Sequence, residues 1–241
     1  MSGPAPTGPR GVLAALQGQL VVSCHAAAGH PLADVGFIVA LCRCAALGGA
    51  AGLRVEGTVN VQAARKATGL PVIGLRKIWG GAYALSDARP AITPTTEDAL
   101  ALEAAGADVV ALEATEELHG EGTKRFVESV RRELRALIMA DVSTLEEGLA
   151  AYEAGADVVG TTLSGYTAGS AGRLRPDLAL VESLAARGVP TVAEGHIVSP
   201  AQARGALEAG ALFVVVGKAI TDPLSTTEAF VSTMRGFGDR R

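Results

Sequence analysis

One pattern decides the fold and occurs three times in the chain: AAGADVVALEA at 104–114, EAGADVVGTTL at 153–163 and EAGALFVVVGK at 208–218. Each copy joins the Ala-rich end of a helix, through Ala-Gly-Ala, to a valine-rich run, and LGGAAGLRVEG at 47–57 is a looser copy. Glycine after a helix adopts the left-handed conformation that closes the last turn, and a continuous apolar run is typical of a strand buried on both faces. The pattern therefore predicts a repeated unit of helix, tight turn and parallel strand.

The rest of the chain supplies enough such units for a closed barrel. Eight strands are predicted, at 20–25, 52–57, 71–77, 109–114, 136–142, 158–165, 190–196 and 212–219. The segments between them carry apolar residues at helical spacing. Within 241 residues, this predicts one (β/α)₈ TIM barrel of the α/β class, which spans residues 11–241 as a single domain after a flexible tail at 1–10.

An open, doubly wound sheet is the main alternative fold. Such a sheet normally has fewer strands and a Gly-rich phosphate loop after its first strand. Here the first predicted strand leads into SCHAAAGHP at 23–31, which lacks that fingerprint. The closed barrel is therefore favoured.

Composition argues against several classes of function. The chain is 49% hydrophobic and has a formal net charge of −4, with no basic stripe that would attract nucleic acid. Its opening, MSGPAPTGPR, has no apolar core of the kind that a signal peptide needs, and no later apolar run is long enough to span a bilayer. We therefore expect a cytoplasmic protein that binds neither nucleic acid nor membranes. No metal site is expected, because Cys42 and Cys44 have only His30 as a nearby spare ligand.

Ionisable residues stand where the predicted strands end. In a TIM barrel the carboxyl ends of the strands form the mouth that carries the chemistry, and strands covered by helices are otherwise apolar. The strand-end residues include His25, Arg54, Lys77, Asp141 and Glu194. A structural alternative is that Arg76 or Lys77 pairs with a neighbouring carboxylate and plugs the barrel. The convergence of so many charges on one mouth favours an active site.

The last two loops at the mouth have features of a phosphate site. Many TIM barrels hold a substrate phosphate with backbone N–H groups after strands seven and eight. Those loops contain Gly195 and Gly217, which allow close approach of the backbone, and His196 and Lys218, which add positive charge. The alternative is that both glycines only turn the chain.

Eight motifs, which include GLRVEG (52–57), VIGLRK (72–77), MADVSTLEEG (139–148) and VAEGHIVSP (192–200), occur in the order found in one known family. Over residues 20–221 the chain resembles the N-acetylmannosamine-6-phosphate 2-epimerases. The resemblance implies a (β/α)₈ barrel that interconverts N-acetylmannosamine 6-phosphate and N-acetylglucosamine 6-phosphate in sialic acid catabolism. It also implies that the reaction needs no redox cofactor and no obligatory metal.

The chemistry of the family matches these residue types. When the sugar ring opens, C2 lies next to an aldehyde, so loss of its proton gives an enolate that can be reprotonated on the other face; this needs a base and an acid. The resemblance implies that Lys77 and Glu194 are the catalytic pair and that Arg54 and Asp141 hold substrate oxygens. A lysine with a reference pKa of about 10.4 is a poor base, so we expect Arg76 and Arg54 to lower it.

Three departures from the family pattern concern the substrate. His25 stands where the family usually has glutamine, and we assign it to substrate binding; His196 and Asp222 replace cationic residues near the phosphate. Two further hypotheses therefore stay open: the same epimerisation on an unphosphorylated or nucleotide-linked acylamino sugar, and a non-catalytic sugar-binding barrel. Because both Lys77 and Glu194 are present, an enzyme is favoured. Ala-rich helices and the resemblance also favour a homodimer.

Overall fold

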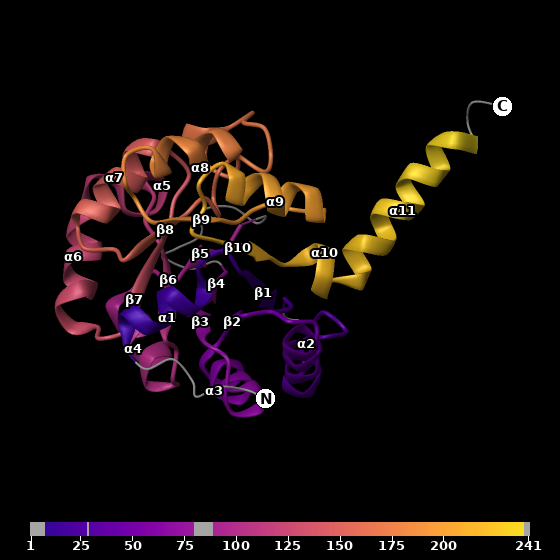
Figure 1. Cartoon of the computed structure of the whole chain (residues 1–241), viewed down its shortest axis with the longest axis horizontal. Helices are drawn as coiled ribbons and strands as arrows, with labels where there is room; N and C mark the ends of the chain where they lie inside the picture. The colour runs from indigo at the N-terminus through magenta and orange to yellow at the C-terminus, as the bar shows by residue number, and fades with distance from the viewer. Residues whose placement is uncertain (1–7, 28, 80–88, 239–241) are drawn as a thin grey trace.

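The eight predicted barrel strands are confirmed by the structure, a computed structural model that describes residues 8–27, 29–79 and 89–238. All eight are parallel, each pairs with the next along the chain, and the last pairs with the first to close the barrel (Figure 1). They are β1 (Leu20–Cys24), β2 (Gly52–Glu56), β3 (Val72–Leu75), β6 (Val109–Glu113), β7 (Leu137–Asp141), β8 (Val158–Gly160), β9 (Thr191–Ala193) and β10 (Phe213–Val216). The chain is therefore a (β/α)₈ TIM barrel.

Helices surround the barrel (Figure 1). Several begin where a hydroxyl side chain caps the first turn: Thr95, Thr144 and Ser199 each accept a hydrogen bond from a backbone N–H three residues on. The helices are α1 (Pro9–Leu16), α2 (Val35–Leu47), α3 (Thr58–Thr68), α4 (Thr96–Ala104), α5 (Glu116–His119), α6 (Thr123–Glu133), α7 (Leu145–Glu153), α8 (Leu178–Ala185), α9 (Pro200–Glu208), α10 (Lys218–Thr221) and α11 (Pro223–Gly238). Among the described residues, none of these helices has the length and apolar character needed to cross a membrane.

Helix α1 covers the amino-terminal end of the barrel. Its Val12 and Leu16 are buried in the same apolar cluster as the inward-facing side chains of the strands. The helix begins at Pro9, so it includes the last two residues of the segment 1–10 that we predicted to be a tail; residues 1–7 lie outside the described part of the chain. Because α1 fills the amino end, the carboxyl-terminal mouth is left to receive a ligand.

A short antiparallel pair of strands follows the third barrel strand. Strand β3 ends at Leu75, two residues earlier than predicted, and Lys77 begins β4 (Lys77–Ile78), which pairs with β5 (Ala91–Ile92). The pairing is continued by Thr93, whose N–H donates to the Arg76 carbonyl at 2.7 Å. Lys77 is therefore held on a small hairpin over the mouth, rather than at the end of a barrel strand.

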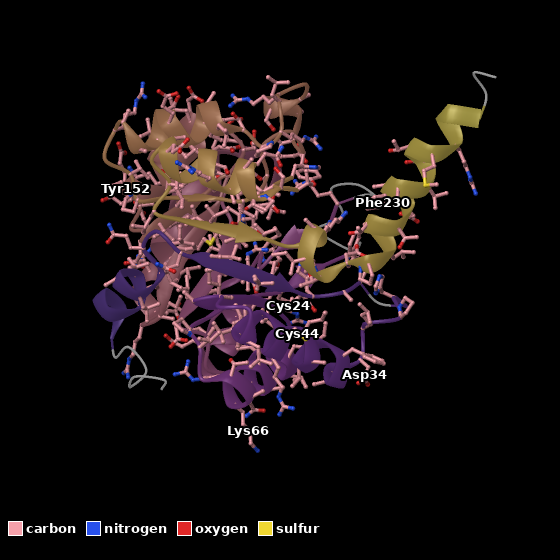
Figure 2. The ribbon with its side chains drawn as sticks, turned by 45° about the vertical axis from the view of Figure 1, so that its right-hand side comes forward. Cys24, Asp34, Cys44, Lys66, Tyr152 and Phe230 are labelled. Atoms are coloured by element: carbon pink, nitrogen blue, oxygen red, sulfur yellow. The ribbon has the colours of Figure 1, made fainter. Side chains whose placement is uncertain are left out.

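Helix α11 stands apart from the other helices. It follows β10 through the short α10, where the eighth covering helix of a TIM barrel is expected, but it projects away from the barrel (Figure 1). Four of its apolar side chains are exposed, namely Leu224, Phe230, Val231 and Met234. Figure 2 shows Phe230 on this projecting helix, clear of the barrel. This placement was not predicted from the sequence.

Candidate active site

A buried arginine joins two carboxylates at the mouth of the barrel. Arg54, in β2, is 2% exposed; it donates to Asp141 Oδ2 at the end of β7 at 2.6 Å and forms an ion pair with Glu194, directly after β9, with Nη1 3.0 Å from Oε1. The structure thus brings together three of the predicted site residues from three strands. Because a buried charge is costly without partners, the positive Arg54 and the two acids stabilise one another.

A threonine hydroxyl completes this network. Thr162, two residues after β8, lies with its Oγ1 2.7 Å from Asp141 Oδ1 and 3.1 Å from Glu194 Oε2. A hydroxyl has a single proton to donate, so Thr162 can donate to one of these acids at a time. The shorter contact favours Asp141 as the acceptor.

The two predicted catalytic groups have pKa values close to neutrality. Burial raises the pKa of Glu194 to about 7, and the neighbouring Asp141 charge adds to the rise while Arg54 opposes it. Burial lowers the pKa of Lys77 to about 8, and Arg54 and Lys218 add to that fall. Both groups can therefore gain or lose a proton near neutral pH, as proton transfer at a carbon acid requires.

Arg76 does not have the role that we predicted for it. Its guanidinium donates to Asp98 Oδ1 on α4 at 2.5 Å, and 51% of its side chain is exposed. Successive residues of an extended chain point to opposite sides, so Arg76 faces outward when Lys77 faces the mouth. The lowered pKa of Lys77 comes first from burial and then from Arg54.

His25 contacts the catalytic lysine. Its two ring nitrogens lie 3.4 Å and 3.3 Å from Lys77 Nζ. Burial, followed by the charges of Lys77 and Arg54, holds the pKa of His25 well below its usual range, so the imidazole is neutral at pH 7. His25 therefore lies at the predicted site, next to the lysine amine.

The predicted phosphate loops are adjacent, because β9 and β10 are paired strands. Gly195 has φ +103°, and a Cβ there would lie 3.3 Å from the Thr162 carbonyl, so glycine is required. Gly217 precedes α10, which Lys218 begins. His196 lies in the same region with φ +56°; burial, followed by the charges of Arg175 and Lys218, lowers its pKa, so it does not supply the positive charge that the sequence predicted. The structure thus places all four predicted residues at one side of the mouth.

Two residues near these loops behave differently from expectation. Asp222 caps helix α11, where its carboxylate accepts from the Ser225 N–H at 3.1 Å and the Ser225 hydroxyl at 2.6 Å. Arg175, which the sequence analysis did not single out, donates to His196 Nε2 at 2.9 Å. No sequence signal marked Arg175, because it lies in a loop far from the end of a strand. Among the described residues, no cluster of three His, Cys, Asp or Glu side chains is arranged to hold a metal ion.

Comparison with known proteins supports one family. Residues 38–236 match the model of NanE, described as "Putative N-acetylmannosamine-6-phosphate epimerase". A protein of Caldanaerobacter subterraneus named "Putative N-acetylmannosamine-6-phosphate 2-epimerase" is 40% identical over 228 residues, which cover 93% of this chain and 94% of that protein. The chain belongs to the NanE family. This confirms the resemblance found in the sequence motifs.

Other members of the NanE family agree with this assignment. A Yersinia pestis protein with the same name as the Caldanaerobacter relative is 45% identical over 207 residues, which cover 86% of this chain and 85% of that protein. The solved structure of the N-acetylmannosamine-6-phosphate 2-epimerase from Clostridium perfringens superposes with a TM-score of 0.82 at 35% identity, covering 92% of this chain and 95% of that one. The NanE family likeness therefore extends over almost the whole barrel.

Replacing Arg54 tests the role of the buried charge network in this NanE-family barrel. We expect Arg54→Met to lower the free energy of unfolding by about 3–5 kcal/mol, because it leaves two buried carboxylates without a counter-charge. Urea denaturation at pH 7 measures the change. The matched control is Lys124→Ala, which removes an ion pair with Glu153 whose partners are 51% and 69% exposed, and which costs less than about 1 kcal/mol. Equal stability of the two variants would refute a central role for Arg54.

Proposed function

We propose that this chain is an N-acetylmannosamine-6-phosphate 2-epimerase, which interconverts the 6-phosphates of N-acetylmannosamine and N-acetylglucosamine without a redox cofactor. One observation carries the proposal: Lys77 and Glu194, with pKa values of about 8 and about 7, follow β3 and β9, which lie opposite each other in the barrel order. The names of the relatives supply the substrate. We place the reaction in the cytoplasm.

Proton transfer proceeds between C2 of the open-chain sugar and these two side chains. In one direction the neutral Lys77 amine removes the C2 proton, and the electron pair passes through C1 to the aldehyde oxygen, which forms an enolate. The protonated Glu194 then donates a proton to the other face of C2, and the aldehyde reforms. In the reverse direction the Glu194 carboxylate is the base and the Lys77 ammonium is the acid, so the pair holds one proton at the start of either direction.

Arg54 stabilises the enolate in this mechanism. Its guanidinium charge lies between the catalytic acid and Asp141, and its Nε–H is buried with no hydrogen-bond partner among the described residues. A buried donor without a partner is costly, so this N–H is suited to a ligand oxygen. Ser23 Oγ is likewise buried and has no partner in the part of the chain that the structure describes. Both groups favour a polyhydroxylated substrate at the mouth.

Isotope exchange tests the proposed reaction. In heavy water, we expect the purified protein to convert N-acetylmannosamine 6-phosphate into the gluco epimer with deuterium at C2, as proton NMR would show. Lys77→Met lowers the rate about 10²- to 10⁴-fold, because the base is lost. Lys66→Met, on the exposed face of α3 (Figure 2), is the control and keeps full activity.

A third variant tests whether Glu194 transfers a proton or only binds the substrate. Glu194→Gln keeps the lysine base but lacks the second acid, so we expect exchange at C2 without inversion. Inversion at the wild-type rate in Glu194→Gln, or no exchange by the wild-type protein, would contradict the mechanism.

The pKa values of the pair predict a bell-shaped pH profile. Below about pH 7 both Glu194 and Lys77 are protonated, so no base is present; above about pH 8 neither is protonated, so no acid is present. We expect kcat/KM to peak between these values, and the profile to be the same in both directions, because the pair holds one proton at the start of each. Initial rates from about pH 5.5 to about 9.5 measure it. A rate that rises steadily across this range would contradict the assignment.

We also infer that the protein is a homodimer, in which α11 packs against a second copy of this chain. The inference is supported by the exposure of Phe230 (69%) and Met234 (71%) on a helix that projects from the barrel (Figure 1). Phe37 on α2, a helix that borders β1 and β2, is also 52% exposed. Large exposed apolar side chains on one helix mark a protein interface. A second copy of the chain carries the same projecting helix and the same exposed Phe37, so the apolar surfaces of two copies can cover each other.

Light scattering after size exclusion tests the dimer. We expect the wild-type mass to equal two chains, and the double variant Phe230→Asp and Met234→Asp to have the mass of one. Ser232→Asp, which places the same charge on the opposite face of α11, remains a dimer. A monomeric wild-type protein would refute the inference.

A further inference from the structure

Three side chains from the loops after β8 and β9 form one stacked group at the mouth. The Tyr166 ring stacks on the His196 ring with a centroid separation of 5.1 Å, and the Arg175 guanidinium carbon lies 4.5 Å from the centre of the Tyr166 ring. Arg175 also donates to His196 Nε2 at 2.9 Å and to the Gly165 carbonyl. We call these residues the Arg175 cluster. Stacking and hydrogen bonds hold the guanidinium in one place although its side chain is exposed.

The hydrogen bonds determine the proton positions in the Arg175 cluster. Arginine only donates, so His196 Nε2 is an acceptor and the ring is neutral, with its proton on Nδ1. The lowered pKa of His196, caused by burial and by the charges of Arg175 and Lys218, agrees with this state. A guanidinium has five N–H groups, of which these contacts use two, so the remaining donors are open to a ligand.

Arg175 has no carboxylate partner among the described residues, although its neighbour Arg173 pairs with Asp177. Its charge is therefore uncompensated in a protein with a net charge of −4. An uncompensated, oriented guanidinium is suited to an anion, since its fork of N–H groups matches the oxygens of a phosphate.

The Arg175 cluster lies beside the reacting groups. His196 is two residues after Glu194, and the charges of Glu194 and Arg175 both affect the pKa of Tyr166. Lys218, at the start of α10, is near enough to lower the pKa values of both His196 and Lys77. The Arg175 cluster therefore lies near both predicted phosphate loops, which follow β9 and β10.

Asp222 stands at the position where the family resemblance leads us to expect an arginine. Its carboxylate caps α11 through Ser225, so it does not supply positive charge. We propose that Arg175, oriented by Tyr166 and His196, supplies the arginine contact to the phosphate dianion of the sugar 6-phosphate in this chain. The cationic contact thus comes from the loop after β8 in place of the loop after β10. This inference rests on the proposed epimerase function.

Steady-state kinetics with N-acetylmannosamine 6-phosphate test the inference. We expect Arg175→Ala to raise KM about tenfold and leave kcat within about twofold, because the contact binds a group remote from C2. Arg175→Lys recovers part of the loss, since it keeps the charge but not the fork. Arg173→Ala, in the same loop, is the control and has the wild-type KM. We expect the affinity for inorganic phosphate, measured by calorimetry, to rank the variants in the same order as their KM values do.

The outcomes separate this inference from the proposed function. If Arg175→Ala has the KM and the phosphate affinity of the wild type, or if it lowers kcat and leaves KM unchanged, Arg175 does not bind the phosphate. If the wild-type protein does not epimerise the sugar but binds inorganic phosphate through Arg175, the proposed function fails and the anion site remains. If neither the wild type nor Arg175→Ala binds inorganic phosphate or epimerises the sugar, both are overturned.

Discussion

The buried guanidinium of Arg54 is the interaction on which the mouth of this barrel depends. It lies between two carboxylates that come from β7 and β9, so one cation connects three strands. The same charge lowers the pKa of Lys77 and opposes the rise in the pKa of Glu194. Structure and chemistry thus share one residue. Burial brings the two catalytic pKa values to about 8 and about 7, and the charge of Arg54, which its ion pairs make tolerable at this depth, lowers both of them.

The sequence predicted the barrel because its signals are local and repeated. Ala-Gly-Ala turns and valine runs mark single units of helix and strand, and eight such units are enough to close a sheet on itself. The pair β4 and β5 was missed because two residues are too few to show any periodicity. The projection of α11 was also missed. An apolar stripe predicts that a helix is covered, but the identity of the covering surface is not encoded within the helix.

The candidate site was predictable in part. Ionisable residues at the ends of apolar strands led to Arg54, Asp141 and Glu194, and the structure brings these together. Arg76 and Lys77 were harder to distinguish, because only the direction of the backbone after β3 decides which of them faces the mouth. Arg175 escaped notice because its position beside Tyr166 and His196 results from how two loops fold against each other. Such contacts between loops leave no pattern in the sequence.

Helix α1 packs on the apolar core at the amino end of the barrel, so ligands reach the site from the carboxyl-terminal mouth. Substrate and product are epimers of equal size and charge, and both must enter and leave through this mouth. One cannot be expelled while the other enters, so each competes with the other for the same place. Since a catalyst leaves the equilibrium constant unchanged, the net flow between the two sugars depends on their concentration ratio relative to equilibrium, while each sugar slows the conversion of the other by occupying the shared site.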